Sequence, residues 1–266
     1  TSKEGRPLPP QVKPAPCPQF KAKMPRFRGL GKPPGHYLIS GPTKSGKTCL
    51  AQNLLFAMKD LPVRVWIFSP TCRTDGENYG PIRKWVYAPK PQGLGVDPSE
   101  ECMFETWDEA KVQEILEVAK RVTSYLKRKN AEGKQREMMH QFIWIDDFGS
   151  DERVSRRSET LKALAQRGRH YYLSILPCIV QKTVSLHPAM RSQMSWIACF
   201  RPLSSQEAHS FATEWGNVHP RGAAGLQDLL YEVTQTPHSF LLIDLSTSPP
   251  TLYKNCLLYT SDAADE

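Results

Sequence analysis

The stretch YLISGPTKSGKTCLAQNLL, residues 37–55, decides the fold. It opens with an apolar run, Tyr37 to Ser40, and closes with a helical pattern from Leu50 to Met58. Between them lie Gly41-Pro42-Thr43-Lys44-Ser45-Gly46-Lys47-Thr48 and then Cys49. These residues match G-x-x-x-x-G-K-[ST], and a strand before it and a helix after it are the context in which that pattern is informative. Glycines let backbone N–H groups surround a phosphate, and the helix N-terminus adds a favourable partial charge. The sequence therefore predicts a phosphate-binding loop.

The last two residues of this loop and a pair of acids later in the chain fit the binding of a nucleoside triphosphate with Mg²⁺. Lys47 is expected to reach the β- and γ-phosphate oxygens, and Thr48 to offer its hydroxyl to Mg²⁺. The apolar run Phe142 to Ile145 ends in two acids: Asp146 is expected to hold the Mg²⁺ shell, and Asp147 to orient and deprotonate the attacking water. For Asp147 the alternative is an acid that merely ends a strand before a turn. The whole prediction requires the loop and the acid pair to emerge from neighbouring strands at one edge of the sheet.

A third polar residue, Gln181, follows the apolar run Leu173 to Val180 directly. Because the carboxyl ends of parallel strands face the ligand crevice, Gln181 can point at the γ-phosphate or its water. We interpret it as a phosphate sensor, and a solvated Gln that opens a loop is the alternative. The guanine-selective Asn-Lys-x-Asp pattern does not occur in the sequence, which favours ATP as the nucleotide.

Short apolar runs alternate with helical periodicity from His36 onward. This alternation predicts a three-layer α/β P-loop NTPase fold (ASCE/RecA-like) with a mainly parallel central sheet. The strands are expected at Tyr37–Ser40, Val63–Ser69, Phe142–Asp146, Leu173–Val180, Ser195–Phe200 and Ser239–Leu245, and the helices at Lys47–Lys59, Trp107–Lys129 and Ser158–Arg167. Thr71–Glu101 and Asn130–Glu137 are expected as surface loops. Pro177-Cys178 interrupts a run that should be a central strand, where proline is unusual.

Composition divides the chain into three parts. Residues 1–35 hold nine prolines, eight Lys or Arg and a single acid, Glu4, so they read as a disordered basic arm and supply most of the formal charge of +8. Residues 36–254 form the predicted ATPase domain. The tail at 255–266 resembles a sequence artefact. Seven cysteines without a C-x-x-C pair favour a reduced, intracellular setting without structural zinc, and no apolar run is long enough to span a membrane.

The block RGRHYYLSILPCIVQKTVSLHPAMRSQMSWIACFR, residues 167–201, narrows the class. Together with IFSPT at 67–71, FIWIDD at 142–147 and HSFLLIDLSTSPP at 238–250, it resembles the viral genome-packaging ATPases of the FtsK–HerA superfamily. The likeness is nearest to the packaging ATPases of poxvirus-like DNA viruses and of related virus-like transposons. The resemblance covers roughly residues 36–250. Each matching segment is short, but the order and spacing of the segments together identify the family more specifically than any single segment does.

This resemblance implies a homo-oligomeric ring that translocates double-stranded DNA into a capsid, with capsid protein as a further partner. It places the protein in the host cytoplasm or nucleus, or with the virion. An arginine from one subunit would complete the neighbour's site, with Arg191 as the first candidate and Arg201 as the second. For both, a surface arginine or a DNA-phosphate contact is the alternative.

DNA contacts are expected from basic residues between the acid pair and the next strand: Arg153, Arg156, Arg157, Arg167, Arg169 and His170. A solvated helix face explains them equally well, because Asp151, Glu152 and Glu159 are interspersed. Two other functions stay open. A small nucleotide or metabolite kinase would need a lid and an acceptor pocket, and a non-catalytic DNA- or capsid-binding module would keep the loop for structure alone.

Overall fold

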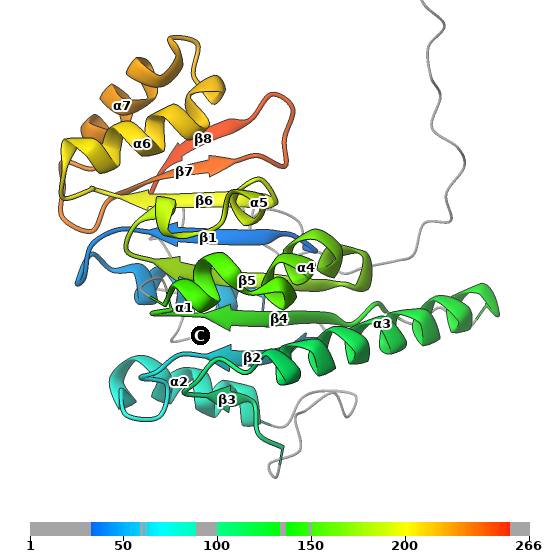
Figure 1. Ribbon diagram of the computed structural model, residues 1–266. Coiled ribbons are helices and arrows are strands. Elements are labelled where there is room, and N and C mark those ends of the chain that lie inside the picture. Colours follow the sequence, from blue (N-terminus) through cyan, green and yellow to red (C-terminus); the bar gives the residue numbers. More distant parts are fainter. Residues whose placement is uncertain are drawn as a thin grey trace, which may run out of the picture.

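A single eight-stranded sheet organises the molecule, in the order β3-β2-β4-β5-β1-β6-β7-β8 (Figure 1). The computed structural model describes residues 33–58, 61, 63–88, 100–133, 137–148 and 151–255. The predicted arm at 1–35 and tail at 255–266 therefore lie almost wholly outside the described residues. The strands are β1 His36–Ser40, β2 Val63–Phe68, β3 Met103–Phe104, β4 His140–Ile145, β5 Leu173–Val180, β6 Met194–Phe200, β7 Phe240–Asp244 and β8 Thr251–Lys254.

The strands from β1 to β6 pair in parallel, and β7 and β8 extend the β6 edge in antiparallel fashion. The prediction of a mainly parallel central sheet is thereby confirmed. β4 and β5 are buried along their whole length, because helices cover both faces of the sheet there. This burial explains why both strands appear in the sequence as continuous apolar runs rather than as alternating patterns.

Helices lie on both sides of the sheet, which gives the expected three layers. In Figure 1, α3 (Glu109–Ala131) and α4 (Glu159–Arg167) lie in front of the sheet and α1 (Lys47–Ala57) lies behind it. Two further helices, α6 (Ser205–Trp215) and α7 (Gly222–Val233), pack on each other beside β6 and β7. The remaining helices are α2 (Gly76–Tyr87), the four-residue α5 (Pro188–Arg191), the π-helical turn η2 (Arg153–Arg157) and the 3-10 helices η3 (Gly168–Tyr171), η4 (Thr183–Ser185) and η5 (Gly216–Val218).

The expectation of a loop across Thr71–Glu101 is wrong for its first half, because α2 forms there. Asp75 caps this helix by accepting a hydrogen bond from the Asn78 backbone N–H, and Tyr79, Ile82 and Val86 bury one face. The glycines and the proline inside the helix concealed this spacing. The predicted loop at Asn130–Glu137 is described only in part.

α6 and α7 lie in a stretch for which no helix was predicted from the sequence. A signal was present for α6, since Ser204 accepts a hydrogen bond from the Glu207 backbone N–H in a Ser-x-x-Glu pattern typical of helix starts. The two-residue β3 and the edge strand β8 are too short or too exposed to leave a clear pattern.

Pro177 lies inside β5 without ending it. The register of β4 against β5 shifts between Ile143 and Ile145, opposite this part of β5. A proline can occupy a central strand at such an irregularity, because the ladder already lacks a hydrogen bond there. The predicted bounds of Leu173–Val180 are therefore correct despite the proline.

Candidate nucleotide site

Three segments meet at the edge of the sheet where the parallel strands end. The 41–48 loop follows β1, the acid pair follows β4, and Gln181 follows β5. Backbone hydrogen bonds hold these ends level, from Gly41 N to Val180 O at 3.2 Å and from Asp146 N to Phe68 O at 3.0 Å. The expectation that the loop and the acid pair leave neighbouring strands is wrong in one respect, because β5 lies between β1 and β4. The shared edge is confirmed.

The 41–48 loop wraps around the start of α1. The Lys47 ammonium donates a hydrogen bond of 2.7 Å to the Pro42 carbonyl oxygen across the loop. Gly41, Lys44 and Gly46 have positive φ values of 155°, 63° and 103°, so three residues of the loop lie in the backbone region that favours glycine. Glycine adopts this conformation without steric cost. Thr48 lies in the first turn of α1, half-buried, beside the free N–H groups of that helix.

His238 contacts this loop from the turn before β7. Its Nδ1 lies 3.1 Å from the Ser45 carbonyl oxygen, a distance at which the ring N–H donates to that oxygen. The contact spans 193 positions of sequence and depends on β7 running antiparallel beside β6. In the sequence, His238 stands out only as the first residue of the family-like segment 238–250, and no role at the site was predicted for it. No local pattern could have revealed the contact.

Asp146 is almost fully buried, with 4% of its surface exposed. Its carboxylate accepts a hydrogen bond of 2.8 Å from the Tyr79 hydroxyl. Burial raises the pKa of Asp146 to about 6, against an opposing hydrogen bond from Tyr79 and attraction by the Lys47 ammonium. Burial also lowers the pKa of Lys47, and the charges of Asp146 and Asp147 partly restore it. The lysine of the loop and the two acids therefore interact electrostatically.

Asp147 differs from Asp146 in its exposure and in its backbone conformation. It is exposed, and its φ of 60° places it in the left-handed region. A non-glycine residue in this region costs free energy, and such residues concentrate at functional sites. The unusual backbone turns the Asp147 side chain into solvent directly after the buried Asp146, which suits an acid that handles water.

The donor set fits a Mg²⁺ ion. Thr48 and Asp146 offer a hydroxyl and a carboxylate, both hard oxygen ligands. A buried carboxylate with a raised pKa is one whose ionised form a divalent cation would stabilise. In the part of the chain that the structure describes, no three His, Cys, Asp or Glu side chains form a metal-binding group. Mg²⁺ takes one or two carboxylates from a protein and completes its shell with phosphate and water.

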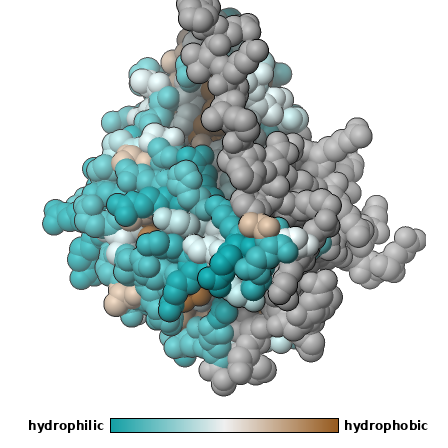
Figure 2. Space-filling model, turned by 90° about the vertical axis from the view of Figure 1, so that its right-hand side faces the viewer, coloured by the Kyte–Doolittle hydropathy of each residue, from teal (hydrophilic) through white to brown (hydrophobic). Residues whose placement is uncertain are grey.

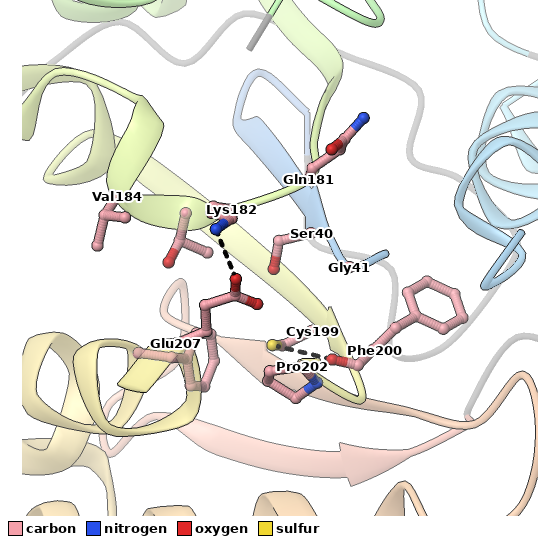
Figure 3. Close-up of a pocket in the computed structure, with 11 residues that line it drawn as sticks. Ser40, Gly41, Gln181, Lys182, Val184, Cys199, Phe200, Pro202 and Glu207 are labelled. Carbon is pink, nitrogen blue, oxygen red and sulfur yellow. Dashed lines mark hydrogen bonds and ion pairs between the residues drawn. The ribbon is translucent and has the colours of Figure 1, made fainter. Parts of the chain in front are cut away.

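Gln181 borders a pocket beside the loop, and its side chain is exposed. Ser40, Gly41, Cys199 and Phe200 line the pocket from β1 and β6 (Figure 3). The Gln181 side chain extends past the end of β1, away from the ion pair of 2.8 Å that Lys182 and Glu207 form on the other side (Figure 3). It is therefore free to contact a group bound at the loop.

The two candidate arginine fingers lie at opposite edges of the sheet. Arg191 ends α5, shortly before β6 begins, and its guanidinium donates to the Leu186 carbonyl oxygen and to Glu214 of α6. Arg201 directly follows β6, at the edge that carries the 41–48 loop, and its guanidinium lies over the Tyr231 ring at 5.3 Å. The role of either arginine toward a neighbouring subunit stays a prediction.

The basic residues expected to contact DNA form two groups rather than one. Arg153, Arg156 and Arg157 lie in η2 after the acid pair, whereas Arg169 and His170 lie in η3, just before β5 begins. The helix α4, which ends at Arg167, separates the groups. Figure 2 shows the side of the molecule where the parallel strands begin, and its described surface is largely hydrophilic.

The mainly parallel sheet and the loop at 41–48 give this protein the P-loop NTPase fold. Among solved structures, the genome-packaging NTPase B204 from Sulfolobus turreted icosahedral virus 2, in complex with sulfate, matches with a TM-score of 0.55 and 14% identity. The match covers 84% of this chain and 96% of that chain. B204 in complex with AMPPCP matches with a TM-score of 0.52 and 14% identity, over 84% of this chain and 98% of that chain.

A third match is the pCW3 conjugation coupling protein TcpA in its monomer form with ATPγS, with a TM-score of 0.51 and 13% identity. It covers 82% of this chain and 59% of that chain. The chain thus has the fold of the viral genome-packaging NTPases and related ATPases, which confirms the predicted likeness at the level of fold. No protein-family model and no curated protein matches the sequence. No helix within the described residues is both long and apolar enough to cross a membrane.

Proposed function

We propose that this protein is an ATP-hydrolysing motor that moves double-stranded DNA and packages the genome of a virus or virus-like element. One observation carries the proposal: the 41–48 loop, the acid pair Asp146 and Asp147, and Gln181 follow β1, β4 and β5 and meet at the same edge of the sheet. A loop that served structure alone would not need two acids and an amide beside it. The similarity between the fold of this chain and that of the packaging NTPases supports a DNA-moving motor over the other ATP-binding functions.

Thr48 and Asp146 would hold Mg²⁺, and Lys47 would bind the β- and γ-phosphates in place of its present contact with Pro42. When bound, Mg²⁺ neutralises the charge that develops on the phosphates. The N–H groups at the start of α1 add hydrogen bonds and a favourable dipole to the phosphate site. Together these groups bind and orient ATP so that its terminal phosphate faces the acid pair.

Asp147 would accept a proton from the water that attacks the γ-phosphate. Its side chain is exposed to solvent, whereas Asp146 is buried and bonded to Tyr79, so the two acids divide the work between water and metal. Gln181 leaves β5 between them and the loop, where an amide can hydrogen-bond both a phosphate oxygen and a water. Its role as a sensor is part of this proposal.

DNA would contact the segment that follows the acid pair. Arg153 and Arg157 are exposed there, and Arg156 donates a hydrogen bond of 2.9 Å to the Val184 carbonyl oxygen in the segment after Gln181. The two segments that leave the site are therefore bonded to each other, and a change at the γ-phosphate can reach cations able to bind DNA phosphates. A homo-oligomeric ring around DNA, completed by a neighbour's arginine, and capsid protein as a further partner belong to the same proposal.

The test is ATP hydrolysis by the full chain with and without duplex DNA. We expect turnover to rise several-fold with duplex DNA, and Asp147→Asn to reduce both basal and stimulated turnover by at least about 10²-fold. Turnover that stays constant over a wide range of DNA concentrations in an assembled sample contradicts the motor. Phosphate transfer to a small acceptor, detected by mass spectrometry, would instead establish a kinase.

A further inference from the structure

Tyr79 brings a hydroxyl to the carboxylate of Asp146 from a helix that the sequence did not reveal. Tyr79 Oη donates a hydrogen bond of 2.8 Å to Asp146 Oδ2, although the residues are 67 positions apart. Tyr79 is 1% exposed and Asp146 is 4% exposed, so water does not compete for this bond. A hydrogen bond to an ionised group is about twice as strong as one between neutral groups.

The tyrosine ring has little freedom to move away. It lies edge-on to Trp144 of β4, with ring centroids 6.1 Å apart and an interplanar angle of 65°. Trp144 and Tyr79 are both among the largest fully buried side chains. Since side chains in a close-packed core hold one rotamer, packing fixes the direction from which the hydroxyl meets the carboxylate.

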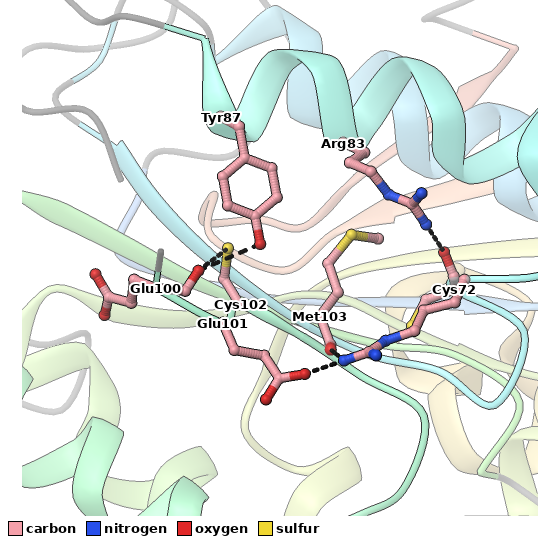
Figure 4. A network of polar contacts seen from close by, with 8 residues as sticks. Cys72, Arg83, Tyr87, Glu100, Glu101, Cys102 and Met103 are labelled. Atoms are coloured by element: carbon pink, nitrogen blue, oxygen red, sulfur yellow. Dashed lines mark hydrogen bonds and ion pairs between the residues drawn. The ribbon is translucent and has the colours of Figure 1, made fainter. Parts of the chain in front are cut away.

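The helix that carries Tyr79 is also held in place at several points. Near its start, the Gln52 amide of α1 donates a hydrogen bond to the Asn78 carbonyl oxygen, which ties α2 to the helix of the phosphate loop. Toward its end, Arg83 donates to the Cys72 carbonyl oxygen at 3.1 Å and Tyr87 donates to the Glu100 carbonyl oxygen at 3.3 Å (Figure 4). These contacts connect α2 to the segments that flank β2 and β3.

We propose that Tyr79 is a positioning residue of the magnesium site. Its hydroxyl fixes the orientation of the Asp146 carboxylate, and α2 thereby joins the phosphate-loop helix to the metal ligand. Partners that orient a metal ligand in this way typically change metal affinity by 10- to 100-fold when they are removed. This inference rests on the proposed function, because it assigns a role at the same Mg²⁺ site.

The test is Tyr79→Phe in the full chain, which removes the hydroxyl and keeps the ring on Trp144. Binding of a fluorescent ATP analogue is titrated with Mg²⁺ and measured again in EDTA. We expect the Mg²⁺ midpoint to rise by about 10-fold or more, while the affinity in EDTA stays within about twofold. Tyr87→Phe is the matched control. It also removes a tyrosine hydroxyl from α2, but that hydroxyl donates to the Glu100 backbone carbonyl and not to a metal ligand. Its Mg²⁺ midpoint should equal that of the wild type.

Thermal unfolding of Tyr79→Phe, Asp146→Ala and the double variant supplies a second readout that does not depend on nucleotide, and alanine removes the acceptor of the Tyr79 hydrogen bond. The two residues are expected to be coupled, so the double variant should lose less stability than the two single variants lose together. A wild-type Mg²⁺ midpoint in a folded Tyr79→Phe protein, or strictly additive effects on stability, overturns the inference and leaves the proposed function intact. Absence of Mg²⁺-dependent nucleotide binding in the wild type overturns both.

Discussion

Arg191 and Glu214 form a salt bridge of 2.9 Å that joins the short helix α5 to α6. The Arg191 side chain is only 12% exposed, and the same guanidinium donates a second hydrogen bond to the Leu186 carbonyl oxygen. This residue therefore has a structural role within its own chain, independent of any role toward a neighbour.

Arg191→Ala should lower the free energy of unfolding by about 1–3 kcal/mol, between the values for exposed and buried ion pairs. Glu214→Gln should lower it by less, because an amide oxygen can still accept the hydrogen bond. Chemical denaturation of both variants measures the effect. If Arg191→Ala abolishes hydrolysis in the assembled protein while its stability is unchanged, the residue acts as a finger alone and the structural role is wrong.

Asp147→Asn should reduce ATP hydrolysis by a factor of about 10² to 10⁴, the usual contribution of general acid–base catalysis. Asparagine tolerates left-handed backbone, so the φ of 60° at this position should survive the change. Nucleotide affinity in the presence of Mg²⁺ should stay within a few-fold of wild type. Asp228→Asn, at an exposed ion pair on α7, is the control, and equal turnover in the two variants would remove Asp147 from the mechanism.

His140 should make the fold sensitive to acid. Burial lowers its pKa to about 4, from an ordinary value of 6.5. Between these values the unfolded chain binds more protons than the folded one, so the stability that His140 contributes is present above pH 6.5 and is lost as the pH falls toward 4. The full loss amounts to about 3 kcal/mol.

His140→Phe should reduce this sensitivity, because the phenyl ring keeps the edge-on contact with Tyr172 and cannot be protonated. The measurement is the free energy of unfolding at pH 7.5 and pH 4.5 for both proteins. Taking the difference between them cancels other titrating groups, including Asp146, whose raised pKa acts in the opposite direction. Parallel pH profiles would show that His140 does not contribute.

Gly46→Ala should weaken nucleotide binding and cost about 1–3 kcal/mol of stability, because an L side chain is strained at its φ of 103°. The added Cβ would lie 3.5 Å from His238 Nδ1, an ordinary contact, so backbone strain rather than collision is the cause. Gly76→Ala, at the start of α2 with no positive φ and open space around its Cβ position, should instead leave stability unchanged or raise it by up to about 1 kcal/mol. Equal effects at the two positions would contradict the strain argument.

The elements predicted correctly from sequence are those whose signals are local. The strand, loop and helix at 36–57 contain a fixed spacing of residue types, and the buried strands β4 and β5 are continuous apolar runs. α2 escaped prediction because Gly76, Gly80 and Pro81 mask an otherwise apolar face. The insertion of β5 between β1 and β4 is a property of topology, which periodicity does not contain.

Site residues follow the same division. Asp146 and Gln181 could be placed because Asp146 ends one predicted strand and Gln181 directly follows another. Tyr79 and His238 could not, since their contacts with Asp146 and Ser45 span 67 and 193 positions of sequence. Such contacts form only when the sheet order and strand directions are fixed, and a single sequence gives no direct trace of them.

The position of His238 also bears on the order in which the protein can assemble. During synthesis the chain emerges from its N-terminal end, so β1 and α1 leave the ribosome long before the turn that precedes β7. Until β6 and β7 have joined the sheet, the loop at 41–48 lacks both Phe200, whose Cβ would lie 2.6 Å from a Cβ at Gly41, and the hydrogen bond from His238. A nascent chain therefore completes its phosphate cradle only after β7 has been synthesised and has paired with β6, which delays nucleotide capture until that point.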